Sequence, residues 1–279
     1  MAEALAIQPI GFHVQLASDW RVSAVSTNIA DFLPVSVDAI IGQSVTGLFS
    51  ESAIHDIRNR MALLRGSEAV EHLFRIVLVD GGEPFDLSIR HSGSGYGLDA
   101  ERCSDRGFGD ATGIIEGMLA RSEEIDDVAQ LCEQAARQVR ALTGFDQVSV
   151  WIGEERIALS ARRSCSRPLS TPGGAEVMIV DLDMAPVLIR LARGCGVGAL
   201  HSALRVPSHE ERDWLVGTGA RAAVAFPLSG SGKPWGLICC QHQSPRHLNL
   251  ERRNIARLFA RILGLRLEVA RLRSAVLRA

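Results

Sequence analysis

The amino-acid sequence predicts an α+β protein of two domains, each an antiparallel sheet flanked by helices. Its 279 residues are enough for two domains of ordinary size, each with its own core. Short segments that alternate apolar and polar residues predict strands, and apolar residues three or four apart predict helices. A stretch rich in Ser, Gly and Asp, 91–110, predicts a loop between two such groups. We therefore place a first domain at 1–100, a linker at 101–112 and a second domain at 113–279.

The first domain is predicted to be a sheet with small helices on one side. The alternation of apolar and polar residues is clearest in 11–16. Asp80-Gly81-Gly82 has the composition of a hairpin turn between two later strands. The expected strands cover 11–16, 22–25, 72–79 and 85–90, and the expected helices cover 26–32 and 52–64.

The second domain is predicted to place its strands between two long helices. The first helix, 113–142, is expected to end at Thr143-Gly144, because a glycine just past the last turn favours termination. The last helix is expected at 249–278, and residues 177–180 fit either a strand or a helix. Between the long helices we expect strands at 147–151, 157–160, 222–228 and 235–242, and helices at 186–193 and 210–216.

The composition favours a globular cytoplasmic protein and excludes several functional classes. Hydrophobic residues make up 47% and charged residues 22% of the chain, and a net charge of −2 produces no field that draws it to nucleic acid or a membrane. No apolar run approaches the roughly 20 residues of a membrane span. The six cysteines have neither the spacing of a secreted disulfide framework nor that of a zinc site, so we expect reduced thiols.

Four stretches, in this order, resemble motifs of one family. Residues 7–11 are similar to the segment that opens the PAS domain of bacteriophytochromes. Residues 143–151 are similar to the first strand of their GAF sheet, 204–222 to a pocket segment, and 235–245 to the last GAF strand. The stretches span almost the entire chain. The resemblance implies a PAS domain followed by a GAF domain, with long helices at a GAF dimer face.

The resemblance also shows where the chain departs from the family. Bacteriophytochromes attach biliverdin through a cysteine upstream of the opening motif, because a thiolate must add to the pigment. None of the six residues before Ile7 is a cysteine. Plant and cyanobacterial relatives use a cysteine at the position of Glu210. We therefore expect neither kind of covalent attachment.

The pocket positions of the family are changed as well. The two pocket histidines fall at Glu211 and Gln241, and His242, next along the strand, is expected to point away from the pocket. Larger indoles replace two pocket tyrosines, at Trp151 and Trp214. Asp183 matches the PASDIP loop of the family. Of the two arginines that clamp a pigment propionate, Arg205 matches and the other falls at Gly198. The vestigial pocket would thus comprise Asp183, Arg205, Glu211, Gln241, Trp151 and Trp214.

Each of these residues also has an ordinary structural interpretation. Trp151 and Trp214 could be core aromatics, Asp183 could cap a helix starting at Pro186, and Arg205 could form a surface salt bridge. In the family, the segment before the PAS domain passes through a GAF loop and forms a figure-of-eight knot. Ile7 would lie at the crossing, and the loop would lie within 196–222.

The terminal helix carries a seam of apolar residues at alternating spacings of three and four. Such a seam is typical of helix-to-helix packing, although one stripe could instead cover the helix's own sheet. Many arginines accompany the seam, and we interpret them as a solvated outer face. We expect a homodimer through 113–142 and 249–278. The predicted interface residues are Ile255, Leu258, Ile262, Leu265, Val269, Leu272 and Val276.

The sequence therefore predicts a degenerate phytochrome-like signalling protein that is independent of light and binds no cofactor. The given sequence ends after the terminal helix, so we expect output through protein–protein interaction. The partners would be a second copy and a regulatory protein such as a transcriptional repressor, which some family members bind, and not nucleic acid or a membrane. The alternative is a photoreceptor that binds biliverdin or another bilin non-covalently.

Two further function classes have little support. A GAF domain can sense a small ligand such as a cyclic nucleotide, but the sequence offers no Gly-rich phosphate cradle. No Ser/His/Asp order, paired-carboxylate site, metal cluster or kinase motif is present, so we expect neither an enzyme nor a metal site.

Overall fold

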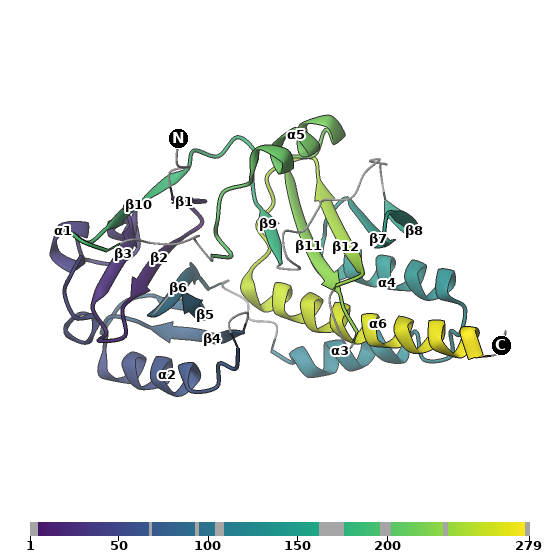
Figure 1. Cartoon of the computed structure of the whole chain (residues 1–279), viewed down its shortest axis with the longest axis horizontal. Helices are drawn as coiled ribbons and strands as arrows, with labels where there is room; N and C mark the ends of the chain where they lie inside the picture. Colours follow the sequence, from purple (N-terminus) through teal and green to yellow (C-terminus); the bar gives the residue numbers. More distant parts are fainter. Residues whose placement is uncertain are drawn as a thin grey trace. The chain divides into compact units, whose positions relative to one another are not determined.

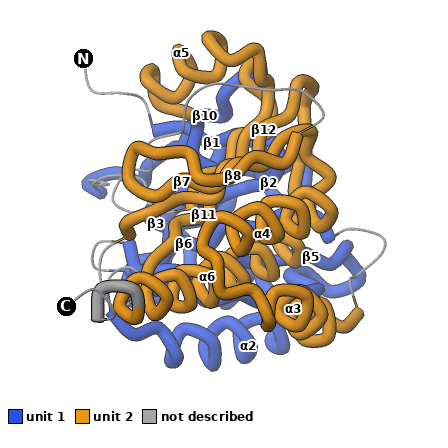
Figure 2. The backbone as a smooth tube through the Cα atoms, turned by 90° about the vertical axis from the view of Figure 1, so that its right-hand side faces the viewer, with its two compact units in different colours: residues 1–106, 184–206 blue, residues 107–183, 207–279 orange. Residues whose placement is uncertain are grey.

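The chain folds into two compact units that do not follow the sequence in a simple order (Figure 1). The computed structural model describes residues 5–66, 69–92, 95–103, 109–161, 176–195, 202–230 and 234–276. The first unit contains 1–106 and 184–206, and the second contains 107–183 and 207–279 (Figure 2). Sequence analysis placed all of 113–279 in the second domain, but 184–206 belongs to the first unit.

The first unit is built on a seven-stranded antiparallel sheet in the order β1-β10-β3-β2-β6-β5-β4. One face carries Phe12, Val14 and Leu16 of β2, which pack with Ile54 and Ile57 of α2 in the core. The strands are β1 Ala6–Ile7, β2 Gly11–Leu16, β3 Val22–Ser26, β4 Val70–Val77, β5 Pro84–Ser92, β6 Gly95–Arg102 and β10 Val187–Leu191. The helices are η1 Ile29–Asp31, α1 Val37–Ile40, η2 Val45–Gly47 and α2 Glu51–Met61.

Two of these strands correct the sequence-based expectations. β6 lies in the stretch that was expected to be a loop. The alternation is concealed there, because Asp99 and Glu101 are as buried as the neighbouring Leu98 and Ala100. Residues 186–193 were expected to be helical, which is wrong. β10 instead pairs with β1 on one side and β3 on the other, so two strand edges determine its conformation (Figure 1).

The N-terminal strand β1 lies between the two ends of 184–206, the later segment that belongs to the first unit. Ile7 pairs with Val187 on one edge and bridges Arg205 on the other. The Gln8 amide donates to the Leu204 carbonyl at 2.7 Å. Ile7 was predicted to lie at the knot crossing, but threading also depends on 1–4 and 196–201, which are outside the described residues. The knot stays a prediction.

A buried polar cluster fastens residues 202–203 to the first sheet. His13 Nδ1 lies 2.7 Å from Asp99 Oδ1, the Ser202 hydroxyl donates to the same oxygen at 2.7 Å, and the Ala203 amide donates to Oδ2 at 2.9 Å. Burial opposes ionisation of Asp99. The hydrogen bonds and the charges of His13 and Arg90 outweigh it, so the pKa of Asp99 is held below its ordinary value.

The second unit is built on a five-stranded antiparallel sheet in the order β8-β7-β12-β11-β9. Helices α4 and α6 contact β7, β8 and β11, and α3 packs against α6. The strands are β7 Gln147–Ile152, β8 Glu155–Ala161, β9 Val177–Ile179, β11 Ala222–Leu228 and β12 Gly236–His242. The helices are α3 Ala111–Ala120, α4 Val128–Thr143, α5 His209–Thr218 and α6 Leu250–Val276.

The helix predicted at 113–142 is two helices. The chain leaves the helical path after α3 and restarts at Asp127, whose carboxylate accepts from the Gln130 amide at 2.8 Å and caps α4. α4 ends as predicted at Gly144, which has a φ of 68°. Within the described ranges, none of the helices combines the length and apolarity needed to cross a membrane.

Candidate functional site

The face of the second sheet that packs against α5 carries most of the predicted pocket residues. Strand register aligns Leu237 with Trp151, Cys239 with Ser149 and Gln241 with Gln147, so these side chains share one side of the sheet. We call this surface the α5 face. Its apolar cluster consists of Trp151, Val177, Ile179, Leu182, Leu215, Ala220, Ala223, Ala225, Leu237 and Cys239, with Trp214 packed against it.

Glu211 is engaged at the beginning of α5. The Ser208 side chain accepts from the Glu211 amide at 3.2 Å, and the Glu211 carboxylate accepts from the Ser208 amide at 2.8 Å. This reciprocal pair is a capping box, which satisfies two backbone donors that the helix would otherwise leave open. The Glu211 carboxylate, which sequence analysis placed at the position of the family's pocket histidine, thus has a structural role.

Gln241 is engaged by its neighbours across the sheet. Its Oε1 accepts from Gln147 Nε2 at 3.0 Å, and its Nε2 donates to the Thr218 hydroxyl of α5 at 3.4 Å. Sequence analysis did not identify Gln147 or Thr218. Strand parity could have found Gln147, because it lies four residues before Trp151 on one strand and therefore faces the same side.

The two tryptophans differ in how their indole donors are satisfied. Trp151 is buried, and its Nε1 donates to the Ser149 hydroxyl at 2.8 Å. Trp214 is partly buried against the cluster, and its buried Nε1 has no hydrogen-bond partner among the described residues. Both indoles occupy volume on the α5 face, as expected of core aromatics.

Asp183 lies at the end of the segment that follows β9. Its carboxylate is 3.0 Å from Nη2 of Arg221, and the same nitrogen is 2.7 Å from Asp181. The hydrogen bond with Asp181 is the main reason that the pKa of Arg221 is raised. The interpretation of Asp183 as a helix cap is wrong, because a strand follows it. Sequence analysis did not identify Arg221.

Arg205 belongs to the first unit, unlike the other five predicted pocket residues. Its Nη1 donates to the Val206 carbonyl at 3.1 Å, and its own carbonyl accepts from Gln8 Nε2 at 2.9 Å. Gly198 is outside the described residues.

His242 lies on the opposite side of the sheet from Gln241, as predicted. Its Nδ1 is 3.0 Å from Asp146 Oδ2, and its ring packs edge-on against Phe145. Burial is the main cause of a lowered pKa at His242. In the same unit, burial raises the pKa of the Cys132 thiol to about 12 and that of Cys240 well above its ordinary value, so both thiols are protonated and weakly nucleophilic.

The predicted seam on α6 is divided by the structure. Ile255 is buried within its own unit, whereas Leu258, Leu265, Val269 and Leu272 are 44–62% exposed. The stripe that packs into the unit instead contains Ala256, Phe259, Ala260, Leu263 and Leu267. Ile262 is half-buried, and the side chain of Val276 is outside the described residues. An exposed apolar stripe with spacings of four, three, four and three therefore runs from Leu258 through Ile262 to Leu272.

The family model of the GAF domain matches residues 127–267. The chain belongs to the GAF domain family. The PAS fold model matches residues 1–102, so the GAF domain follows a PAS domain, which is the arrangement of the phytochrome photosensory core. The predicted family and fold class are thereby confirmed.

Known phytochromes match most of this PAS–GAF chain. The phytochrome-like protein Cph1 of Synechocystis sp. is 23% identical over 291 residues, covering 92% of this chain and 38% of that protein. The bacteriophytochrome of Pseudomonas aeruginosa is 24% identical over 294 residues, with the same coverage of 92% and 38%. The chain thus spans about two fifths of the length of these curated relatives.

A solved structure shows the same fold. The chromophore-binding domain of Stigmatella aurantiaca phytochrome P1 has a TM-score of 0.78 at 24% identity, with coverage of 94% of this chain and 97% of that one.

Proposed function

We propose that this PAS–GAF chain is a non-enzymatic signalling protein that works without a pigment and independently of light, through protein–protein interaction. The observation that carries the proposal is the state of the α5 face. Gln241 bonds to Gln147 and Thr218, Glu211 caps α5, and Trp151 bonds to Ser149 within the cluster. The polar groups of Gln241, Glu211 and Trp151 are therefore already engaged within the protein, and Trp214 Nε1 is the exception.

These side chains also suit a bilin poorly. A bilin carries propionate carboxylates and pyrrole N–H groups, which the family binds with arginine and histidine. An ionised glutamate can accept from a pyrrole N–H, but unlike histidine it cannot donate a hydrogen bond, and it repels a propionate. An indole donates a single hydrogen bond and fills more volume than a phenol. Asp183 is paired with Arg221, which reduces the positive charge that this arginine could offer to a carboxylate.

Expression in cells that also make biliverdin tests this proposal. The purified chain is expected to show no absorption band in the red, while the chromophore-binding domain of the Stigmatella aurantiaca phytochrome, made in the same cells, serves as the positive control. A red band in stoichiometric amount would overturn the pigment-free function.

The alternative function is non-covalent binding of biliverdin or another bilin. It is favoured by one observation, the buried Trp214 Nε1, which has no hydrogen-bond partner among the described residues and could donate to a ligand. In this case a red band would form, would disappear on unfolding in urea, and would be weakened by Trp214→Phe. No change of colour with Trp214→Phe would count against this role of the indole.

We also propose that the chain forms a homodimer through the exposed stripe of α6. Apolar side chains at heptad spacing are stabilised by a facing helix, because packing removes them from water. A groove of about 330 Å³ beside the stripe, lined by Ile125, Leu131 and Val269 among others, could accept side chains of the second copy.

Sedimentation of Val269→Glu tests the dimer. We expect the variant to be monomeric at concentrations where the natural chain is dimeric. Val216→Glu, at an exposed valine on α5, is the matched control and should leave the dimer intact. A monomeric natural chain, or an unchanged Val269→Glu dimer, would exclude this interface.

The second proposed partner is a regulatory protein, and a transcriptional repressor is the candidate from the family resemblance. Direct binding to nucleic acid is not proposed, because several α6 arginines are engaged by protein groups. Arg253 lies 3.2 Å from Glu176, Arg266 donates to the Ser122 carbonyl at 2.8 Å, and Arg271 stacks on Trp235. Binding of a purified repressor should have the same affinity in darkness and in red light. A difference between the two conditions would contradict light independence.

A further inference from the structure

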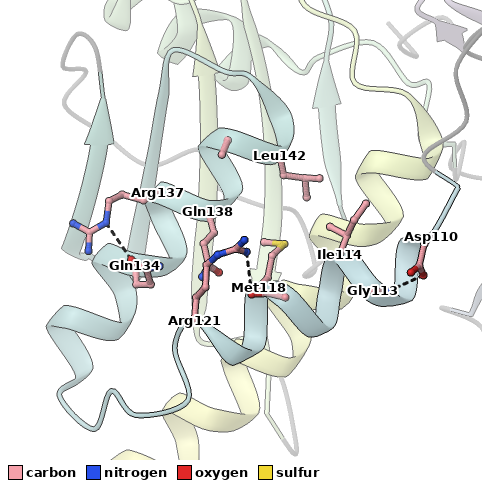
Figure 3. A pocket seen from close by; sticks show the side chains of 11 residues that line it. Asp110, Gly113, Ile114, Met118, Arg121, Gln134, Arg137, Gln138 and Leu142 are labelled. Atoms are coloured by element: carbon pink, nitrogen blue, oxygen red, sulfur yellow. Dashed lines mark hydrogen bonds between the residues drawn. The ribbon is translucent and has the colours of Figure 1, made fainter.

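An open groove of about 870 Å³ runs between α3 and α4 in the second unit (Figure 3). It follows α3 from Asp110 at the start to Arg121 at the end, and Ile114, Met118 and Leu142 contribute apolar walls. Its size is near the upper end for ligand sites in proteins. The groove shares no residue with the α5 face or with the exposed stripe of α6. It does lie within 113–142, which was also expected at the dimer face, so a second copy is the competing occupant.

Gln138 is the unusual residue of this groove. Its side chain points from α4 toward α3 in Figure 3 and is only 8% exposed. Neither Oε1 nor Nε2 has a hydrogen-bond partner among the described residues. A buried amide without partners is destabilising, and a Met of similar size would avoid that penalty. An amide at this position is therefore explained best by a group that binds to it.

The amide restricts the chemistry of that group. Gln138 needs both a donor for its oxygen and an acceptor for its nitrogen. A carboxylate or an acyl chain supplies no donor, and the backbone of a helix is already bonded internally. An extended peptide presents free N–H and C=O groups together, and its apolar side chains match the walls of the groove.

The charge at the end of the groove adds a second requirement. Arg121 is exposed, and Nη1 donates to the Gly117 carbonyl at 3.0 Å. Its guanidinium has no carboxylate partner within the described part of the chain. An acidic side chain on the bound peptide could pair with it in a bidentate manner.

We propose that the α3–α4 groove binds an extended, apolar segment of a partner protein that carries an acidic residue. One peptide group of the segment pairs with the Gln138 amide, and the acidic residue pairs with Arg121. This inference rests on the proposed function, in which the chain acts through a protein partner, and assigns a surface and a chemistry to that contact.

Selection of short random peptides displayed on phage against the full chain tests the groove. The strongest binder is then synthesised with a fluorescent label, and its affinity is measured by polarisation. Gln138→Met is expected to weaken binding about tenfold, the loss of one hydrogen-bonded group. Gln130→Met, at an exposed position of the same helix, is the matched control and should bind normally.

Gly117→Leu provides a second, steric test. A Cβ at Gly117 would meet only Arg121 Nη1, at 3.6 Å, so the variant should fold. Its side chain would fill the groove, and we expect peptide binding to be lost. The melting temperature of Gln138→Met should rise, because an unpaired buried amide is removed. A residue with a purely structural role would lower it.

Three results would overturn the proposal. The first is equal affinity of the selected peptide for the natural chain, Gln138→Met and Gly117→Leu, and the second is failure to select any peptide. The third is a dimer that Gly117→Leu dissociates, because that result would assign the groove to a second copy. A red absorption band with normal peptide binding would overturn the pigment-free function and leave the groove assigned. A colourless chain that selects no peptide would leave the pigment-free function standing and overturn the assignment of the groove.

Discussion

Two buried glutamines in the second unit have opposite surroundings. On the α5 face, Gln241 bonds to both Gln147 and Thr218, whereas in the α3–α4 groove both amide atoms of Gln138 lack a partner among the described residues. The residue type and the degree of burial are similar, so neither distinguishes a filled site from one that can accept a ligand. What distinguishes them is whether their polar atoms have hydrogen-bond partners. By this measure the position of Gln241 is filled and that of Gln138 is open.

Among the variants that test this comparison, removal of a large side chain from the α5 face should have the largest effect on stability. Trp151→Ala is expected to lower the free energy of unfolding by about 4 kcal/mol, because it leaves a cavity in the cluster. Urea denaturation measures this loss. Trp235→Ala, at a half-buried tryptophan of the same unit, should cost much less. Equal losses would show that the α5 face is not tightly packed.

The buried polar cluster around Asp99 in the first unit is a charged pair that can be compared with the hydrogen-bonded glutamines of the second unit. Asp99→Asn is expected to lower the free energy of unfolding by about 3 kcal/mol, because it removes the charge from a buried pair with His13. The control, Asp19→Asn at an exposed aspartate, should change it by less than about 0.5 kcal/mol. A similar small loss at Asp99 would mean that the cluster adds little stability.

The acid dependence of the same cluster has a definite sign. The pKa of Asp99 is held below its ordinary value of 3.8, so its stabilising contribution is complete above that value. The contribution is lost as the pH falls through the lower pKa of the folded state. The stability difference between the natural chain and Asp99→Asn should therefore persist at about pH 5 and shrink at still lower pH. Unfolding in urea across this range provides the measurement.

A smaller effect is expected when the bonded glutamine pair is broken. Gln241→Leu leaves the Gln147 amide without one of its partners and should cost about 2 kcal/mol. The double variant Gln147→Leu with Gln241→Leu should recover part of this loss, because both partners are then apolar. A double variant that is as unstable as the sum of the single variants would show that the two amides are not coupled.

The smallest predicted effect compares open and packed glycines. Gly117→Ala should raise the free energy of unfolding by about 0.5–1 kcal/mol, because alanine favours a helix and the groove leaves room for its methyl group. Gly236→Ala should be destabilising, because a Cβ there would meet the Trp151 carbonyl oxygen at 2.6 Å. Thermal melts measure the stability of both variants. A lower melting temperature for Gly117→Ala than for Gly236→Ala would contradict the open groove.

The local patterns were sufficient for much of the fold but not for all of the site. Alternation and turn chemistry placed β2, β7, β11 and β12 close to their observed positions, and the parity of β12 correctly separated His242 from Gln241. The partners of Gln241 could not be predicted, because Thr218 comes from α5 and meets the strand only in the folded unit. The polar pairing that closes the α5 face is therefore a tertiary property.

The sequence by itself determined the family and the PAS–GAF order, because these depend on residue identity and short-range spacing. The tertiary structure decided that 187–191 is a strand, because the edges of β1 and β3 supply its hydrogen bonds. It also decided that Asp99 is buried and paired, since Ser202 and Ala203 reach it from far along the chain. Which glutamine is satisfied depends on groups brought together from distant segments, and no local pattern contains that information.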